Sequence, residues 1–144
     1  MSTAGSPKLE FLRNRRSLNR ILLSQLLQKH VQLSSSDLTK IQESCTYLSN
    51  LKTKSLKGKT DKFQVFDNIV YKVEIVLGTN IYKLALPTNF AYSVLFNSHY
   101  IQAKHLSAQS HTDFFGANFY VWDCLGLAKS IVSRCITCTL NTRN

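Results

Sequence analysis

Histidines and cysteines in the C-terminal third of the chain have a spacing that suits a metal ion. His99 and His105 are separated by five residues, and 29 further residues lead to the pair Cys135 and Cys138, with two residues between them. Imidazole nitrogens and thiolates are donors that zinc prefers, and four such ligands in a tetrahedron form a closed structural site. A closed site has no open position for a catalytic water, so the spacing predicts one structural zinc ion per chain.

A third histidine leaves the ligand set open. His111 follows His105 at the same spacing at which His105 follows His99. The spacing by itself therefore allows two histidine pairs, His99 with His105 or His105 with His111. Either pair would complete a four-ligand site with the two cysteines.

Other chemistry for the cysteines is less consistent with the sequence. A redox Cys-x-x-Cys pair belongs at a helix N-terminus after a strand, whereas Cys135 follows a helical pattern. The first residues do not have the pattern of a secretory signal, which disfavours disulfides and predicts an intracellular, non-secreted protein. Cys45 and Cys124 stand alone and are expected to be core residues. No phosphate-binding glycine loop or nucleophile elbow is present, and we predict no catalytic residue.

Three short helices are expected to position the ligands. They are a helix capped by Thr88 that ends at His99, a helix capped by Ser107 that runs through Phe115, and a helix from Asp123 to Arg134. His105 would then lie just before the second helix, and the cysteines in the turn that ends the third. A unit of this size usually needs a metal or a disulfide to be stable, so the zinc would supply much of its folding free energy.

The residues before this unit predict two helices, a linker and a small sheet. A helix is expected over Leu9–Val31, and a second begins at Asp37, because apolar side chains at positions 38, 41, 45, 48 and 51 share one helical face. The run Lys52–Lys62 is expected to be a loop. Segments 63–66, 69–77 and 81–86 are rich in β-branched and aromatic residues and predict an antiparallel meander that ends at Pro87.

These elements define an α+β protein in three parts. We predict a basic helical segment over 1–36, an extension over 37–86 with a helix, a lysine-rich linker and the meander, and a zinc-binding domain over 87–144. No apolar run approaches the roughly 20 residues that a membrane helix needs, so no membrane partner is expected.

The charge of the chain favours a polyanionic partner. The net charge is +10, and residues 1–62 carry +8 of it. Such asymmetry favours DNA contacts to phosphates, with low sequence specificity, although a solvated basic face is the plainer alternative. The candidate contact residues are Arg13, Arg15, Arg16, Arg20, Lys52, Lys54, Lys57, Lys59 and Lys62. The aromatic residues of the meander (Phe63, Phe66, Tyr71 and Tyr82) could stack on single strands, but packing within the sheet is the favoured interpretation.

The C-terminal pattern resembles the His-His-Cys-Cys domain of retroviral and retrotransposon integrases, most closely those of gypsy-like long-terminal-repeat elements. The matching residues are Leu86-Pro87, His99, His105-Leu106, the aromatic pair Phe119-Tyr120, and Arg134 to Cys138. Upstream, Phe66 to Lys72 resembles a short strand that often precedes this domain in such elements. Three positions depart from the family pattern: Lys104 replaces a glycine, His111 stands where threonine is usual, and Trp122 falls one residue late.

The resemblance implies a ligand set and a role. It selects His99, His105, Cys135 and Cys138 as ligands and leaves His111 as a solvent-facing helix residue. It implies a part in DNA integration through DNA association or self-association into oligomers. Whether the basic cluster also carries a nuclear address is left open by the sequence. The three carboxylates of an integrase core are missing, because only Asp113 and Asp123 follow Glu74, so no enzyme activity is expected. The alternatives are a zinc-stabilised protein-interaction scaffold, in which the helix over Leu9–Val31 docks onto a partner, and a decayed retroelement fragment.

Overall fold

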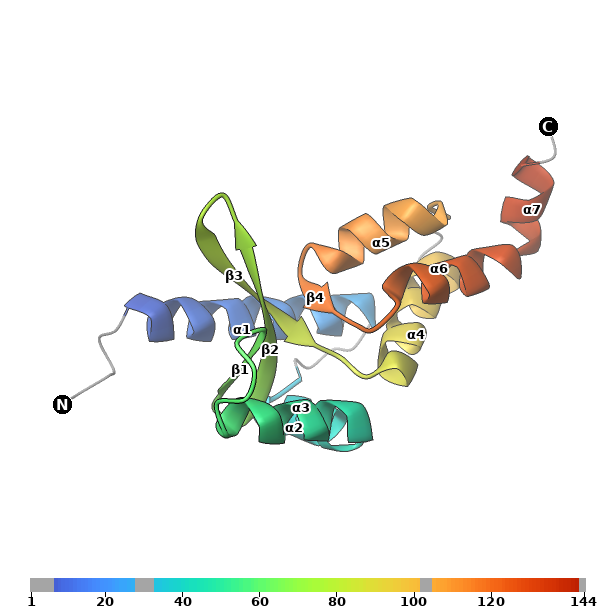
Figure 1. Ribbon diagram of the computed structural model, residues 1–144. Coiled ribbons are helices and arrows are strands. Elements are labelled where there is room, and N and C mark those ends of the chain that lie inside the picture. Colours follow the sequence, from blue (N-terminus) through green and yellow to red (C-terminus); the bar gives the residue numbers. More distant parts are fainter. Residues whose placement is uncertain (1–6, 28–32, 102–104, 143–144) are drawn as a thin grey trace.

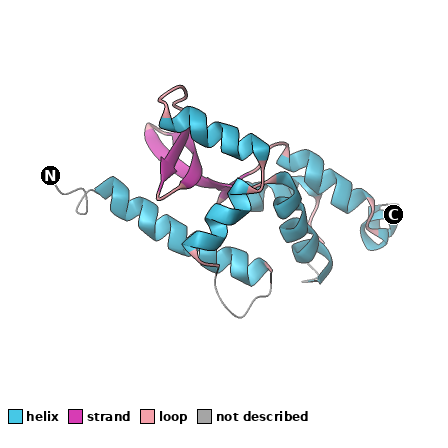
Figure 2. Cartoon of the chain, turned by 90° about the horizontal axis from the view of Figure 1, so that it is seen from below, coloured by secondary structure: helices cyan, strands magenta, loops and turns pink. Residues whose placement is uncertain are grey.

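A computed structural model describes residues 7–27, 33–101 and 105–142 of the chain. Helices precede and follow a small sheet, which confirms the predicted α+β class (Figures 1 and 2). The N-terminal half contains α1 (Pro7–Leu26), α2 (Ser35–Glu43), α3 (Thr46–Leu56), β1 (Phe63–Phe66), β2 (Ile69–Val76) and β3 (Thr79–Ala85). The C-terminal half contains α4 (Thr88–Phe96), the π-helical turn η1 (Asn97–Ile101), α5 (Ala108–Gly116), β4 (Phe119–Tyr120), α6 (Cys124–Ser133) and α7 (Ile136–Thr142).

The first helix begins close to its predicted start and ends earlier than predicted. Pro7 is the first residue of α1. Proline, which lacks an N–H, is tolerated there because an N–H at the first helical position has no partner within the helix. The helix ends at Leu26, and positions 28–32 of the predicted Leu9–Val31 helix lie outside the described residues. Leu23 and Leu26 are buried, so this end of α1 belongs to the core.

The single helix predicted from Asp37 is wrong, because the chain forms two helices there. The first is capped by Ser34, whose hydroxyl accepts the Asp37 N–H while the Asp37 carboxylate accepts the Ser34 N–H. It ends where the Ser44 hydroxyl donates to the Ile41 carbonyl at 2.6 Å, and Cys45 is extended, with φ of −111° and ψ of 118°. Such a side-chain bond competes with the helical ladder, and the chain turns before α3.

The lysine-rich segment predicted as a loop is partly helical. Lys52 and Lys54 lie on α3, which continues to Leu56. The helix ends at Lys57, and Gly58 follows with φ of 68°, a conformation that glycine adopts without strain. Only the second half of the predicted loop is irregular.

The predicted antiparallel meander is present. Two-residue turns connect its strands, Asp67-Asn68 between β1 and β2 and Leu77-Gly78 between β2 and β3. All four turn residues have positive φ, as the tight hairpin turn requires. The sequence did not reveal β4, which pairs with β3 in parallel through Leu84 with Phe119, giving the order β1-β2-β3-β4.

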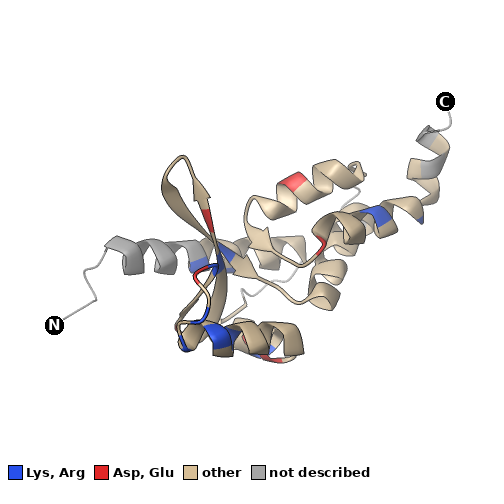
Figure 3. Ribbon diagram, viewed as in Figure 1, with Lys and Arg blue, Asp and Glu red and all other residues tan. Residues whose placement is uncertain are grey.

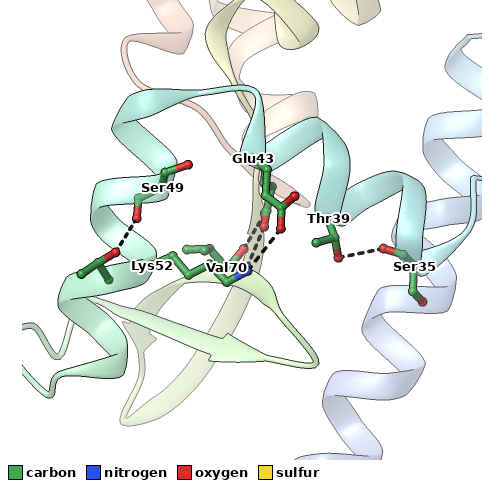
Figure 4. Close-up of polar contacts among 8 residues, drawn as sticks. Ser35, Thr39, Glu43, Ser49, Lys52 and Val70 are labelled. Carbon is green, nitrogen blue, oxygen red and sulfur yellow. Dashed lines mark hydrogen bonds and ion pairs between the residues drawn. The ribbon is translucent and has the colours of Figure 1, made fainter.

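Polar contacts hold α2 and α3 against the end of the sheet. The buried Gln42 amide donates to the carbonyls of Val70 and Ala85 at 3.0 and 2.7 Å, and its oxygen accepts the Val70 N–H at 2.8 Å. Lys52 on α3 forms an ion pair of 3.9 Å with Glu43 on α2, beside Val70 (Figure 4). These contacts fix the two helices relative to β2 and β3.

One hydrophobic core joins the sheet to helices from both halves of the chain. Its fully buried members include Leu23 of α1, Tyr71 of β2, Val94 of α4, Phe115 of α5 and Ile131 of α6. Among the four aromatic residues of the meander, Phe63, Tyr71 and Tyr82 are buried and Phe66 is partly buried, as expected for packing within the sheet. Within the described residues, no helix has the length and apolar character to cross a membrane.

Candidate metal centre

His99 lies on the turn that extends α4. The helix begins after Pro87 rather than with Thr88 as its cap, and after Phe96 it widens into η1, which carries His99. The His99 side chain is completely buried. Tyr100 anchors the same turn, because its hydroxyl donates to the Ile131 carbonyl of α6 at 3.1 Å.

His105 approaches from the segment before α5. Ser107 caps that helix as predicted, and its hydroxyl accepts the Ser110 N–H at 3.1 Å. His105 is exposed, in contrast to His99. Lys104, the departure from the family glycine, lies outside the described residues.

The two cysteines lie at a junction between helices, where the sequence predicted a terminal turn. The helix predicted over Asp123 to Arg134 is α6, which is capped by Asp123 and ends at Ser133. Cys135 follows it, and its N–H donates to the Val132 carbonyl at 3.1 Å. The chain then forms α7, a helix that the sequence analysis missed, and Cys138 lies on its first turn.

The four predicted ligands converge on one point. The Nε2 atom of His99 lies 3.3 Å from Nδ1 of His105 and 3.3 Å from Sγ of Cys138. The same His105 nitrogen lies 3.5 Å from Sγ of Cys135 and 3.7 Å from Sγ of Cys138. All four donor atoms fall within 4.8 Å of one another, so the group could hold a metal ion.

The surroundings shift the pKa values of Cys135 and His99 toward the forms that bind a metal, and that of Cys138 in the opposite direction. The pKa of the Cys135 thiol lies below its usual value. The cause is hydrogen bonds from the Cys138 backbone, the Cys138 side chain and the Thr137 backbone, which together outweigh the opposing effect of burial. The pKa of Cys138 is raised, by burial first and by its neighbour Cys135 second. Burial, and then the positive charge that His105 would carry, lower the pKa of His99 and favour its neutral, ligating form.

His111 corrects the sequence analysis, which expected it to face solvent. It is 2% exposed, and its Nε2 lies 2.7 Å from Nδ1 of His99, the nitrogen that points away from the other ligands. Burial, and then His99 and His105, lower the pKa of His111 to about 4. His111 is outside the group of converging donors, so the structure brings together His99 and His105 rather than the alternative pair.

A helical spacing in the sequence could have revealed the burial of His111. Phe115, the buried aromatic residue of α5, comes four residues after His111 and therefore lies on the same face. The prediction for His111 has two alternatives, a metal ligand and a surface residue. A buried histidine that contacts a ligand is a third.

The basic residues proposed for DNA binding are distributed between structural contacts and exposed positions. Arg16 forms an ion pair of 2.8 Å with Asp67, and Arg20 donates to the Leu33 carbonyl. Lys52 pairs with Glu43, while Arg13 and Arg15 lie on α1 with side chains outside the described part of the structure. Figure 3 shows basic residues gathered at α3 and the start of the sheet, where Lys54, Lys57, Lys59 and Lys62 are exposed.

Comparison with protein-family models, curated proteins and solved structures finds no significant match. The features of this chain that indicate a function are therefore its donor cluster and its charges.

Proposed function

We propose that the chain is a structural zinc-binding module, non-catalytic by itself, that serves an integrase-like protein of a retroelement. The observation that carries the proposal is the convergence of two imidazole nitrogens and two sulfurs from three separate segments of the chain. His99, His105, Cys135 and Cys138 would hold the ion, which would supply a fixed link between η1, the segment before α5, and α7. A closed set of four protein ligands is typical of structural zinc.

The donor separations suit a tetrahedral zinc ion. Zinc binds nitrogen at about 2.0–2.1 Å and sulfur at about 2.3 Å, so tetrahedral ligands lie about 3.3 Å apart for two nitrogens and about 3.6 Å for a nitrogen and a sulfur. The corresponding separations here are 3.3 Å between the two imidazoles and 3.3 to 3.7 Å between imidazoles and thiols. Magnesium and calcium prefer oxygen ligands, which this group does not offer.

Elemental analysis of the protein purified under reducing conditions tests the site. We expect one zinc ion per chain, and circular dichroism should report loss of helix when a chelator removes it. His99→Ala should abolish binding, whereas Cys45→Ser, at a cysteine outside the donor group, should leave the zinc content unchanged. Zinc content near zero in the unaltered protein would contradict the proposal.

DNA association is the second part of the proposed role. Its support is the net charge of +10 and the exposed lysine patch, defined as Lys54, Lys57, Lys59 and Lys62. Arg16 and Arg20 already have partners within the chain, so we assign them a smaller share of DNA contact than the patch. Contacts to phosphates would give binding without sequence preference.

A salt titration tests this part. Binding of a labelled duplex is measured by fluorescence anisotropy at several salt concentrations, for the unaltered protein and for a variant with all four patch lysines changed to Gln. Each lost phosphate contact should reduce the slope of log K against log salt by about 0.9. The matched control is Lys129→Gln on α6, which removes one exposed charge elsewhere. An unchanged slope in the patch variant would contradict DNA contact at the patch.

A protein-interaction scaffold is the other candidate, and one observation favours it. The tip of the hairpin formed by β2 and β3 presents apolar side chains to solvent, with Ile75 of β2 74% and Leu77 of the turn 100% exposed. Contact with a protein through these side chains would persist at high salt, unlike phosphate contact. Sedimentation of the protein at low and high salt, with Leu77→Ser as the variant, measures whether the turn mediates self-association. A salt-independent dimer that the variant abolishes would favour the scaffold.

A further inference from the structure

His111 contacts a candidate ligand at the atom that the metal would leave free. Its Nε2 lies 2.7 Å from Nδ1 of His99, and both side chains are buried. The other nitrogen of His99, Nε2, faces His105 and Cys138 at 3.3 Å each. The two nitrogens of His99 therefore contact different neighbours, Nδ1 with His111 and Nε2 with the other donors.

This arrangement determines which nitrogen carries the proton in the rings of His99 and His111. If Nε2 of His99 gives its lone pair to a metal, the ring proton must be on Nδ1, and that N–H can only donate toward His111. His111 must then accept at Nε2 and carry its own proton on Nδ1. Ligating histidines almost always donate their second N–H in this way, and the acceptor fixes both the tautomer and the orientation of the ring.

The burial of His111 indicates that this side chain serves as a hydrogen-bond acceptor for His99 and not only for packing. His111 shares a face of α5 with Phe115, and these side chains are 2% and 1% exposed. An aliphatic residue would satisfy packing at such a position, and a buried imidazole is costly unless it is hydrogen-bonded. The contact with His99 supplies that hydrogen bond.

We propose that His111 is a positioning residue of the metal site, which orients His99 and selects the tautomer that binds the ion through Nε2. The inference rests on the proposed zinc-binding function and deepens it. His111 is not a fifth ligand, because its accepting nitrogen faces His99 rather than the other three donors.

The test compares two replacements of similar size. His111→Leu removes the acceptor, whereas His111→Gln keeps an oxygen that can accept the His99 N–H. Cobalt(II) serves as a spectroscopic probe, and its affinity and that of zinc by competition are measured for each protein. We expect His111→Leu to weaken metal binding by about 10- to 100-fold, with most of the loss recovered in His111→Gln.

A second measurement needs no variant. Long-range proton–nitrogen NMR spectra of the zinc-loaded, unaltered protein should show His99 protonated at Nδ1, with coupling across the hydrogen bond to His111. Equal metal affinity in all three proteins, or a His99 protonated at Nε2, would overturn the role of His111 while leaving the zinc site intact. Failure of the unaltered protein to bind either metal would overturn the proposed zinc function and, with it, this inference.

Discussion

The sheet region and the region of the four donors differ in how far their apolar side chains are buried. In the sheet, Tyr71 and Leu84 are completely buried, and a second small cluster around Leu48 attaches α3 to the strands. At the other end of the molecule, α7 leaves Ile136 76% and Leu140 56% exposed. The sheet region is therefore held by apolar packing, while α7 depends on the junction that contains the two cysteines.

The helices between the sheet and α7 are held by apolar packing and also lead to the four donors. Val94, Phe115 and Ile131 join α4, α5 and α6 to the same core as the sheet. The distal ends of these helices lead to His99, His105 and Cys135. A metal at the four donors would thus stabilise the ends of helices whose middles are already packed, and the two regions should respond separately to mutation.

The largest expected effect is the loss of one ligand. Cys138→Ser should abolish zinc binding and reduce the free energy of unfolding by several kcal/mol, because binding energy at a structural zinc site is folding energy. Hydrogen exchange should locate the damage, with faster exchange in α7 and at residues 105–107 and little change in β2 and β3. Cys45→Ser is the matched control. Equal loss of protection in the sheet would show that the two regions are one cooperative unit.

Gln42 provides the reciprocal experiment on the sheet side. Gln42→Ala leaves the N–H and carbonyl of Val70 and the carbonyl of Ala85 without their side-chain partner in a buried site. We expect a loss of about 2–4 kcal/mol, measured by urea unfolding, with zinc affinity unchanged. Gln109→Ala, at an exposed amide on α5, is the control and should cost under about 0.5 kcal/mol. A large fall in zinc affinity in Gln42→Ala would contradict the separation of the two regions.

Asp123 offers a smaller test at the helix that connects the regions. It caps α6 by accepting the Gly126 N–H at 3.3 Å, and it does so with φ of 54° and ψ of 51°. Asp123→Ala loses the cap and keeps a conformation unfavourable for alanine, so we expect a loss of about 1–2 kcal/mol in thermal unfolding. Asp123→Asn keeps both properties and should be nearly neutral. If the Ala variant is also neutral, the cap does not stabilise α6.

The parts of the molecule that were predictable from sequence depend on short-range patterns. Alternating β-branched residues indicated the meander, and the spacing of His99 and His105 with Cys135 and Cys138 indicated the donors, because ligand chemistry restricts residue types strongly. At the break between α2 and α3 the Ser44 hydroxyl bonds the Ile41 carbonyl, in a stretch whose apolar periodicity continues unbroken. No periodicity reveals such a local competition.

Other features depend on contacts between distant segments. The strand β4 consists of two residues that pair with β3 in parallel, and Phe119 is 35 positions away from its partner Leu84. The contact of His111 with His99 likewise requires α5 to pack beside η1. A single sequence read by local patterns contains no signal for either pairing.

The smallest expected effect at neutral pH concerns Tyr71, at the centre of the sheet region. Its side chain is completely buried, and no hydrogen bond reaches its hydroxyl from the described residues. Removing a hydroxyl that has no partner should be neutral or slightly stabilising, so Tyr71→Phe should change the free energy of unfolding at pH 7 by about 0.5 kcal/mol or less.

The pH dependence of the free energy of unfolding of the same variant tests whether the centre of the sheet region excludes water. Burial raises the pKa of Tyr71 to about 12, with opposing smaller effects of Arg16 and Asp67. The unfolded chain releases the phenol proton near pH 10, while the folded chain keeps it, so the stability contributed by the neutral phenol is intact below pH 10 and is lost as the pH rises toward 12. Urea unfolding between pH 9 and 12 should therefore show a steeper loss of stability in the unaltered protein than in Tyr71→Phe. Parallel curves would mean that Tyr71 ionises equally in both states, and that water reaches the centre of the sheet.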